Sequence, residues 1–563
     1  MDRSLLHRAL TLYGQGQFSA AADLCRRHLE AEPASAEAAL LLGESLLALE
    51  RPREALEALE PVLARHPHDA QLEAALGEAH LALGHLQAAI AHLRHALQRQ
   101  PSATAWYQLG RARERQGQRR EACAAWTQAL ALDAEHLPSL EALGRCYLEE
   151  GDATGAELCY RRALAQAPDN LALRNGLALA LEAQGRFEAA LTCLWPLRHL
   201  ADREPRLANN LGLLHQHLGL LQAARGWYRL ALDRAPEARE IEWNLALCLL
   251  QSGDFDEGWR RFEARWDLPG FREQRRRFPT PPWDGRPLDG ETLLLHAEQG
   301  LGDTLQFVRL APHAAARGAR VVLECQPSLA PLLTGLDGIE AVVPRGAPLP
   351  PHRHHCPLMG LPRALGLTLE QLPAAPIPYL HADPARRARW QQRLPARDGR
   401  PRVGVVWAGN PRRHDPVTRR IDRRRSLPLE HLLPLLERDD VCWISLQRDE
   451  AAARAQSLLG RLGVHAVGPH LADFADTAAV VAELDLVIAV DTAIVHLAGA
   501  MGRPVWVLSR FDACWRWLHG REDSPWYPTL RLLRQPRPGD WNALLRRVAR
   551  DLDAFTAHPA TPA

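Results

Sequence analysis

The sequence predicts an α-solenoid followed by an α/β module that is built on two parallel sheets. Two observations predict this architecture: glycines recur at a fixed period in the first half, and short apolar runs alternate with helix-like runs in the second half. At 563 residues the chain is too long for one hydrophobic core, so several domains are expected.

The glycines of the first half form two periodic series. One is spaced by 33 or 34 residues and consists of Gly84, Gly117, Gly151, Gly185, Gly219 and Gly253. The other lies between these positions and consists of Gly43, Gly77, Gly110, Gly144, Gly176 and Gly212. Apolar residues at helical spacing surround both, as in "AWYQLGRARERQGQRREACAAWTQALALD". The pattern predicts about eight units of helix, glycine turn and helix over residues 1–266, and it resembles the tetratricopeptide repeat, whose period is 34 residues.

Stacked repeats of this kind bury a continuous core and present a long concave groove. Because such grooves usually bind proteins, we expect this one to hold a protein or peptide segment. The alternative that the sequence leaves open is a spacer, or an arm through which the chain forms homo-oligomers.

Composition excludes several classes of function. The net charge of +1 gives no general attraction to nucleic acid or to anionic membranes. The chain has no lysine, so a Walker-type P-loop is excluded and any cationic phosphate clamp must be built from arginine. The N-terminus lacks the apolar run of a signal peptide, and no uncharged run is long enough to span a membrane. We therefore expect a cytoplasmic protein, whose ten scattered cysteines are reduced thiols.

The second half follows a proline- and arginine-rich linker, which we predict over residues 267–290. Alternating strands and helices then predict one α/β domain over residues 291–398 and another over residues 399–563. The cluster "HRHHC" lies in a proline-rich stretch that we expect to be a loop, without regular ligand spacing, so we assign no metal to it. Ligands bind at the carboxyl ends of parallel strands, which places the expected site in the cleft between the two domains.

The segment "HAEQGLGDTLQFVRL" supplies the first part of that site. A strand is expected before it, and Gly302 allows a sharp turn into the next helix. The carboxylate of Asp303 could then accept a proton from an incoming hydroxyl group. The alternative is that Asp303 only caps the helix.

The segment "AVDTAIVHLAGAMGRPV" supplies the second part. A strand ends at Asp491, and a helix begins near Thr492. Free backbone N–H groups and the helix dipole favour a phosphate there, and His496 could add a hydrogen bond from the first turns. Alone, Asp491 could be a cap and His496 a core residue, but the combination favours a nucleotide-diphosphate site.

Two further strand ends face the same cleft. The segment "GNPRRHDPVTRRIDRRRSLPLE" contains Asn410 and the seven arginines that lie from Arg412 to Arg425, and it is expected to be a loop that brings arginines to the diphosphate. A solvated basic loop is the alternative. The segment "SLQRDE" places Gln447 where it could contact a ribose or a base.

From Trp283 onward, the chain resembles the inverting GT-B glycosyltransferases related to the heptosyltransferases of lipopolysaccharide assembly. "GD" at 302–303 matches their early Gly-Asp pair, and "DTAIVHLAGAMGRPV" matches the stretch that holds the donor diphosphate, although Ala493 stands where those enzymes carry glycine. "SPWYP" and "PLMGLP" are closer to a bacterial group in which tetratricopeptide repeats are fused to this domain. Some members of that group resemble flagellin-modifying glycosyltransferases.

The resemblance implies a GT-B module of two Rossmann-like domains, with the acceptor on the first domain and the nucleotide sugar on the second. It implies an inverting, metal-independent glycosyltransferase without a cofactor, in which Asp303 is the base. The acceptor would be a serine or threonine of a protein that the repeat groove recruits, with flagellin as the leading candidate. Two other functions stay open: a protein-interaction scaffold with a degenerate transferase domain, and a lipopolysaccharide heptosyltransferase-like enzyme.

Overall fold

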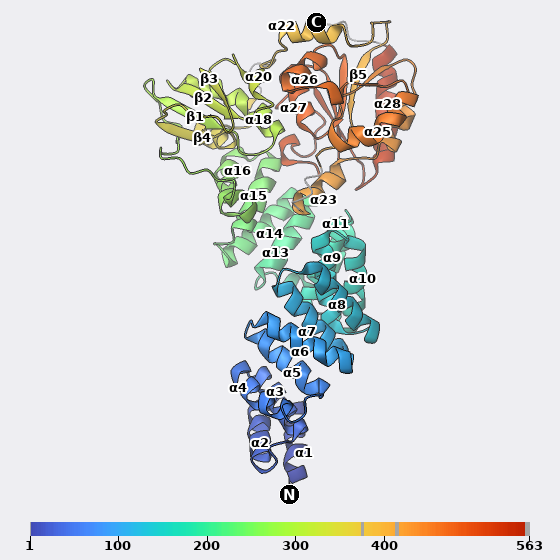
Figure 1. Cartoon of the computed structure of the whole chain (residues 1–563). Helices are drawn as coiled ribbons and strands as arrows, with labels where there is room; N and C mark the ends of the chain where they lie inside the picture. The colour runs from blue at the N-terminus through green and yellow to red at the C-terminus, as the bar shows by residue number, and fades with distance from the viewer. Residues whose placement is uncertain (1, 373–376, 411–415, 558–563) are drawn as a thin grey trace. The chain divides into compact units, whose positions relative to one another are not determined.

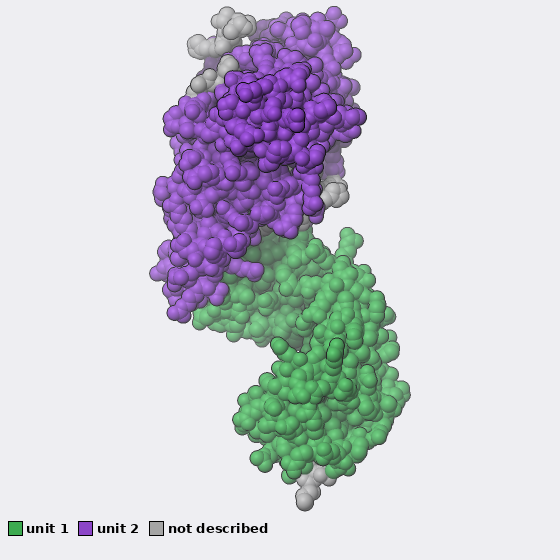
Figure 2. All heavy atoms as spheres, turned by 90° about the vertical axis from the view of Figure 1, so that its left-hand side faces the viewer, with its two compact units in different colours: residues 1–184 green, residues 185–563 purple. Residues whose placement is uncertain are grey.

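The computed structural model describes residues 2–372, 377–410 and 416–557 (Figure 1). The chain divides into two compact units, residues 1–184 and residues 185–563 (Figure 2). Among the described residues, no helix combines the length and the apolar character that crossing a membrane requires.

Unit 1 is entirely helical within its described residues. Its helices are α1 (Asp2–Gly14), α2 (Phe18–Ala31), α3 (Ala36–Ala48), α4 (Pro52–Leu63), α5 (Ala70–Ala82), α6 (Leu86–Arg99), α7 (Ala103–Arg115), α8 (Arg119–Leu132), α9 (Leu137–Glu150), α10 (Ala153–Gln166) and α11 (Leu171–Ala183). Several begin at a residue whose side-chain oxygen accepts a backbone N–H of the first turn, including Ser35, Asp69, Ser102, Asp152 and Asn170.

Glycine is required in the two series for different structural reasons. Glycines of the first series end the first helix of each repeat in a left-handed backbone conformation, which residues with a side chain rarely adopt. The φ angle is +86° at both Gly151 and Gly253. The second series lies where helices cross: a Cβ atom on Gly212 would come within 2.8 Å of the Tyr228 ring. The observed helical array therefore follows from both periodicities that the sequence carries.

Unit 2 begins with the last helices of the repeat array. These are α12 (Phe187–Leu194), η1 (Trp195–Leu200), α13 (Pro205–His217), α14 (Leu221–Arg234), α15 (Arg239–Ser252), α16 (Phe255–Arg261), η2 (Phe262–Asp267) and α17 (Pro269–Arg272). The boundary between the compact units thus falls within the repeats, and not at residue 266 where their sequence pattern ends.

The rest of unit 2 contains two parallel sheets, as the sequence predicts. The first has the order β3-β2-β1-β4, and the second has the order β10-β9-β8-β5-β6-β7. The strands are β1 (Thr292–His296), β2 (Arg320–Cys325), β3 (Ala341–Pro344), β4 (His354–Pro357), β5 (Arg402–Val406), β6 (Cys442–Ser445), β7 (His465–Ala466), β8 (Leu486–Val490), β9 (Val505–Ser509) and β10 (Leu530–Arg534). In the first sheet, Leu293 of β1 is paired with Val321 on one side and with His354 on the other.

Helices cover both faces of the six-stranded sheet. In Figure 1, α25 and α28 lie on one face, and α26 and α27 lie on the other. The helices of both domains are α18 (Leu301–Phe307), α19 (Ala311–Ala315), α20 (Ala330–Leu333), α21 (Leu361–Leu365), α22 (Pro384–Gln391), α23 (Pro416–Arg425), α24 (Leu433–Leu436), α25 (Asp449–Arg461), α26 (Phe474–Val481), α27 (Ala493–Ala500) and α28 (Trp541–Ala557). Each face has its own cluster of buried apolar side chains, so the sheet is buried on both sides.

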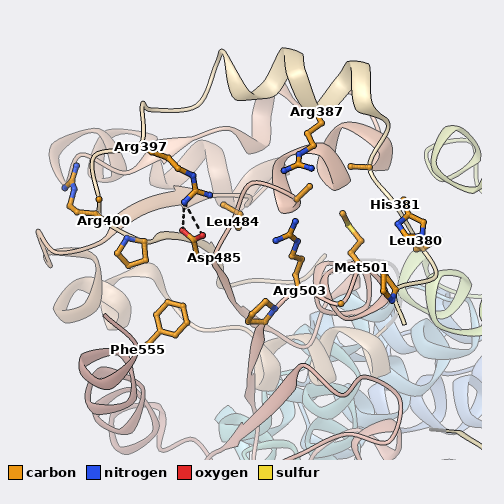
Figure 3. Close-up of a pocket in the computed structure, with 17 residues that line it drawn as sticks. Leu380, His381, Arg387, Arg397, Arg400, Leu484, Asp485, Met501, Arg503 and Phe555 are labelled. Atoms are coloured by element: carbon orange, nitrogen blue, oxygen red, sulfur yellow. Dashed lines mark hydrogen bonds and ion pairs between the residues drawn. The ribbon is translucent and has the colours of Figure 1, made fainter. Parts of the chain in front are cut away.

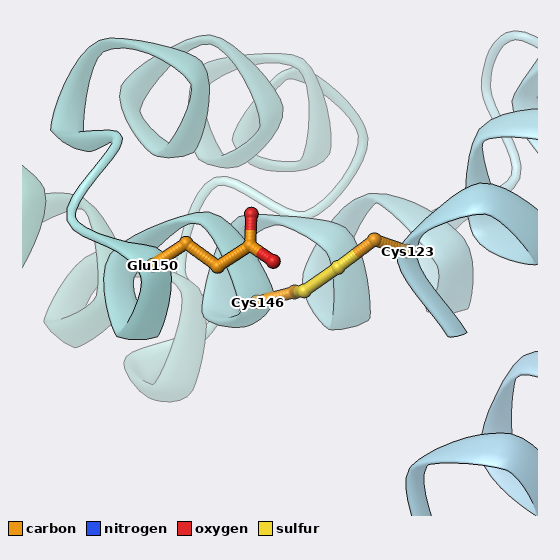
Figure 4. Close-up of side chains that lie close together, drawn as sticks. All are labelled: Cys123, Cys146 and Glu150. Carbon is orange, nitrogen blue, oxygen red and sulfur yellow. A yellow bond between two sulfur atoms is a disulfide. The ribbon is translucent and has the colours of Figure 1, made fainter. Parts of the chain in front are cut away.

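Three local predictions are wrong. The stretch with "HRHHC" is not only loop, because residues His354 to Pro357 form β4 and pair with β1. The arginine-rich segment contains α23, although residues 411–415 of that segment lie outside the described part of the chain. The cysteines are not all reduced: Cys123 of α8 is bonded to Cys146 of α9 (Figure 4). These helices are neighbours and place the two Cα atoms 6.5 Å apart, within the range of a disulfide.

The last repeats pack directly on the α/β domains. The turn glycines Gly219 and Gly253 approach His519 and Leu369, whereas the equivalent turn glycines Gly84 and Gly117 of unit 1 have open space around the Cβ position. An ion-pair cluster adds to this junction. Asp512 lies 3.3 Å from His217 Nδ1 of α13 and 3.3 Å from Arg424 Nη1 of α23. Burial alone would raise the pKa of Asp512, but the neighbouring Arg510 guanidinium, together with His217 and Arg424, holds it below its usual range.

The predicted linker is also partly packed. Trp283 is 4% exposed, and its backbone N–H donates to the carbonyl of His355 in β4. Arg276 is ion-paired with the buried carboxylate of Glu324. Part of the predicted linker therefore extends the edge of the first sheet.

Candidate active site

The structure brings the two principal sequence segments together. Gly302 lies in the first turn of α18, directly after β1, and His496 lies in α27, directly after β8. A Cβ atom on Gly302 would come within 2.8 Å of His496 Cδ2 and 3.4 Å of Ala493 Cα. The first turns of α18 and α27 are therefore in contact, and glycine at position 302 permits that contact.

Asp303 lies at the third position of α18, because the helix begins at Leu301. Its Oδ2 accepts the backbone N–H of Gly300 at 2.8 Å, and its Oδ1 is ion-paired with Arg516 Nη2. The side chain keeps 17% exposure. Each carboxylate oxygen can accept more than one hydrogen bond, so the capping role leaves room for an incoming hydroxyl group.

Arg516 is a site residue that the sequence analysis missed. It lies in η8 (Trp515–Trp517), which follows β9, and its side chain is 14% exposed. Its guanidinium also lies over the Trp515 ring, 4.4 Å from the centroid. Burial alone would lower the pKa of Arg516, but the carboxylate of Asp303, the neighbouring Cys514 and the carboxylate of Asp491 hold it above its usual value. Arg516 is therefore a permanent positive charge between the two halves of the site.

His496 has the contacts of a packing residue. It is 4% exposed, its ring is stacked on Trp517 at 5.3 Å, and its Nδ1 lies 3.1 Å from the Tyr527 hydroxyl. Burial lowers the pKa of His496 to about 4, so the imidazole is neutral at pH 7. Without a bound ligand it therefore carries no positive charge, and its roles are hydrogen bonding and positioning.

The start of α27 has the features of an anion site. Thr492 is the N-cap residue, but its side chain does not accept a backbone N–H, and its hydroxyl is buried without a hydrogen-bond partner among the described residues. Arg425 Nη1 donates to the backbone carbonyl of Asp491 at 3.2 Å. The same guanidinium is ion-paired with Asp422 at 2.9 Å. Uncapped N–H groups and an adjacent guanidinium form the environment that phosphate oxygens favour.

Gln447 and Asn410, the other two predicted donor contacts, have different surroundings. Gln447 is 6% exposed, and its Oε1 accepts the backbone N–H groups of Trp407 and Ala408 at 3.1 and 3.0 Å. It therefore fixes the segment after β5. Asn410 is exposed at the end of that segment. Before it, Gly409 allows the Arg425 side chain to lie against the backbone.

Aromatic residues of the last repeat helices lie beneath this site. Trp259 of α16 makes edge contacts with Phe307 of α18 at 5.8 Å and with Trp515 at 5.3 Å. Trp515 is adjacent to Arg516, so the repeat helices help to position the partner of Asp303. The segment "DEGWRRFEARW" thus belongs to the core of unit 2.

A buried ion pair joins the repeats to the loop that precedes Asp303. Arg265 of η2 is fully buried, and its Nη2 lies 3.2 Å from both carboxylate oxygens of Glu298. Burial raises the pKa of Glu298 to about 7 despite this contact. Because Glu298 lies two residues before Gly300, the pair anchors the turn that presents Asp303.

Comparison with known proteins matches the first half of the chain to repeats and part of the second half to a glycosyltransferase family. Models of the tetratricopeptide repeat match residues 40–104, 107–170 and 147–212, and a model of anaphase-promoting complex, cyclosome, subunit 3 matches residues 2–62. A model of glycosyltransferase family 9 (heptosyltransferase) matches residues 432–508. Protein FlbA of Caulobacter vibrioides is 28% identical over 513 residues, which cover 80% of this chain and 84% of FlbA.

The chain joins tetratricopeptide repeats to a family 9 glycosyltransferase domain. The family match includes β6, β8 and α27, and with them Gln447, Asp491 and His496. Asp303 and Arg516 lie outside the matched range. The candidate anion site at the start of α27 is therefore within the glycosyltransferase match, whereas Asp303 lies near it only in the structure.

Solved structures resemble the repeats of this glycosyltransferase. A thermophilic tetratricopeptide-repeat protein of Thermus thermophilus is 32% identical and covers 32% of this chain and 99% of its own, with a TM-score of 0.29. A tetratricopeptide-repeat protein from Parabacteroides merdae is 15% identical and covers 44% of this chain and 98% of its own, with a TM-score of 0.32.

Proposed function

We propose that this glycosyltransferase moves a sugar, with inversion, from a nucleotide-sugar donor to a serine or threonine of a protein acceptor. The acceptor hydroxyl attacks the anomeric carbon as the bond to the donor diphosphate breaks. Asp303 accepts the hydroxyl proton, and the nucleoside diphosphate leaves with the bonding electrons. The contact between Gly302 and His496 is the observation that carries this proposal, because it places a carboxylate beside an uncapped helix terminus.

The donor diphosphate would lie at the first turn of α27. Backbone N–H groups after Asp491 and the Arg425 guanidinium would bind its oxygens, and Arg516 would add positive charge on the side of Asp303. The neutral His496 would hold α27 against α18 and could donate one hydrogen bond. Asn410 and Gln447 remain proposed donor contacts, Gln447 through the β5 segment that it fixes.

The acceptor is proposed to be recruited by the repeats. Polar side chains on successive first helices of unit 1 bond across repeat boundaries: Gln108 Nε2 donates to Glu78 Oε1, and Arg145 Nη2 donates to Glu114 Oε1, each at 2.7 Å. A protein segment lying along these helices would meet a row of hydrogen-bonding groups. Flagellin is our leading candidate for the acceptor, from the resemblance to flagellin-modifying enzymes with the same layout.

Two other functions are weighed against this proposal. The ion pair between Arg516 and Asp303 lies beside an uncapped helix. A binding scaffold with a degenerate transferase domain has no use for such an arrangement, which therefore favours an enzyme. Slow hydrolysis of a nucleotide sugar would exclude the scaffold. A lipopolysaccharide heptosyltransferase-like enzyme would instead transfer its sugar to deacylated lipid A core, and not to protein.

The donor site predicts a specific loss of affinity. Arg425→Ala should weaken the binding of a nucleoside diphosphate by roughly 1.5–3 kcal/mol, the usual cost of losing a charged hydrogen bond. Isothermal titration calorimetry measures this loss. Arg423→Ala, an exposed neighbour in the same helix, is the matched control and should bind normally. Since Asp422 loses its ion pair in Arg425→Ala, the melting temperature of the variant must also be recorded. Equal affinity in a folded Arg425→Ala protein would place the diphosphate elsewhere.

A further inference from the structure

A cavity of about 670 Å³ lies at the amino ends of the six-stranded sheet (Figure 3). Its lining includes Pro401 before β5, Asp485 before β8 and Pro504 before β9. Asp491 and Gln447 follow the carboxyl ends of β8 and β6, at the opposite end of the strands of the same sheet. The cavity is therefore separate from the proposed donor site.

The lining combines basic and apolar side chains. Its basic residues are Arg387, Arg397, Arg400 and Arg503. Met501, Leu484 and Phe555 supply apolar surface beside them. A volume of this size accommodates a small organic molecule, and the mixed lining fits one that is apolar at one end and anionic at the other.

Three of the four arginines have a carboxylate partner. Arg387 Nε lies 2.6 Å from Glu483, Arg397 Nη1 lies 3.1 Å from Asp485, and Arg400 Nη2 lies 2.6 Å from Asp398. These ion pairs hold the rim of the cavity in place. They do not neutralise the fourth arginine.

Arg503 lacks such a partner. Within residues 2–372, 377–410 and 416–557, no hydrogen bond or ion pair to its guanidinium is found, and Figure 3 shows the side chain between Asp485 and Met501. Only its backbone carbonyl is used, as the acceptor of the Thr529 hydroxyl. Burial and the neighbouring Arg387 lower the pKa of Arg503, and although the carboxylates of Glu483 and Asp485 act in the opposite direction, its surroundings on balance oppose its positive charge. A bound anion would remove that unfavourable interaction.

We propose that this cavity binds a small phosphorylated organic molecule. The phosphoryl group would bind the Arg503 guanidinium, whose planar set of donors matches phosphate oxygens. The organic part would lie against Met501 and Phe555. Because the cavity lies at the opposite end of the strands from the start of α27, such a ligand is distinct from the sugar donor.

Phenyl phosphate is a suitable probe because it carries one phosphoryl group and one apolar ring. Calorimetry with the full chain should show that Arg503→Gln weakens its binding by roughly tenfold to 100-fold, as expected for a lost charged hydrogen bond. The same variant should bind a nucleoside diphosphate normally, whereas Arg425→Ala should show the reverse pattern. Arg461→Gln, an exposed arginine in α25, is the matched control and should change neither affinity.

The stability of the free variant distinguishes a ligand site from a structural arginine. Since Arg503 has no bonded partner, Arg503→Gln without ligand should melt at or above the temperature of the wild type. Unchanged binding of phenyl phosphate in Arg503→Gln, or a melting temperature several degrees lower without ligand, would overturn the proposal. If inorganic phosphate binds as tightly as phenyl phosphate, the apolar surface contributes nothing and the organic part of the proposal is wrong.

Discussion

Asp303→Asn should lower sugar transfer by about 10²–10⁴-fold, the usual effect of removing a general base, while the protein still binds its donor. Asparagine keeps the size of the side chain but cannot take up the acceptor proton. Its amide group can accept from only one of the two donors, Gly300 N–H and Arg516, so a small loss of stability is expected as well. Turnover is measured with purified protein and the nucleotide sugar that a thermal-shift panel selects.

Two controls separate this loss from misfolding. The calorimetric affinity for nucleoside diphosphate should stay within a few-fold of the wild type, because the diphosphate is expected at α27. The pH dependence should also change, since the group that takes the proton is gone. Turnover close to that of the wild type in Asp303→Asn would exclude Asp303 as the base.

Removal of unit 1 should abolish recognition of the protein acceptor and spare donor binding. A chain that begins at residue 185 retains all of unit 2, including the contacts of α13 and α16 with the α/β domains. Transfer to flagellin should fall by about 10²–10⁴-fold, the range by which a second binding surface raises effective affinity. Mass spectrometry of the acceptor measures the transfer.

A short serine- and threonine-containing peptide is the matched control for this truncation. Such a peptide offers no second segment for unit 1 to bind, so the full chain and the truncated chain should modify it equally slowly. Transfer to flagellin at full efficiency by the truncated chain would mean that unit 1 does not recognise the acceptor.

The position of the truncation matters. Deleting residues 1–250 would remove α13 and α14 and nearly all of α15, and would leave Trp259 and Phe262 without part of their surrounding core. Both residues are buried beneath the site. A loss of activity in that shorter protein would therefore report misfolding and not acceptor recognition.

Much of the fold could be predicted because its signals are local. The 34-residue period predicts the paired helices of the repeats. The strand, turn and helix around Asp491 could be predicted because they are contiguous in the chain. β4 was missed because proline and histidine surround a strand of four residues, and its formation depends on pairing with β1. α23 was missed because its density of arginine resembles a solvated loop.

The candidate site was harder to predict, because its contacts join distant positions. Arg516 is 213 residues from Asp303 along the chain, and nothing in "CWRWLHG" indicates an aspartate partner. Trp259 and Arg265 reach the site from the repeats, whose sequence pattern indicates only helices. His496 was predicted to contact the donor, but its burial against Trp517 could not be read from a helical pattern.

The most direct test of the account is a crystal structure of the full chain with a nucleoside diphosphate. We expect diphosphate oxygens within hydrogen-bonding distance of the backbone N–H groups at the start of α27 and of the Arg425 guanidinium. We also expect an open path from the anomeric position to Asp303. A diphosphate bound only elsewhere, such as at Arg503, or separated from Asp303 by packed side chains, would contradict it.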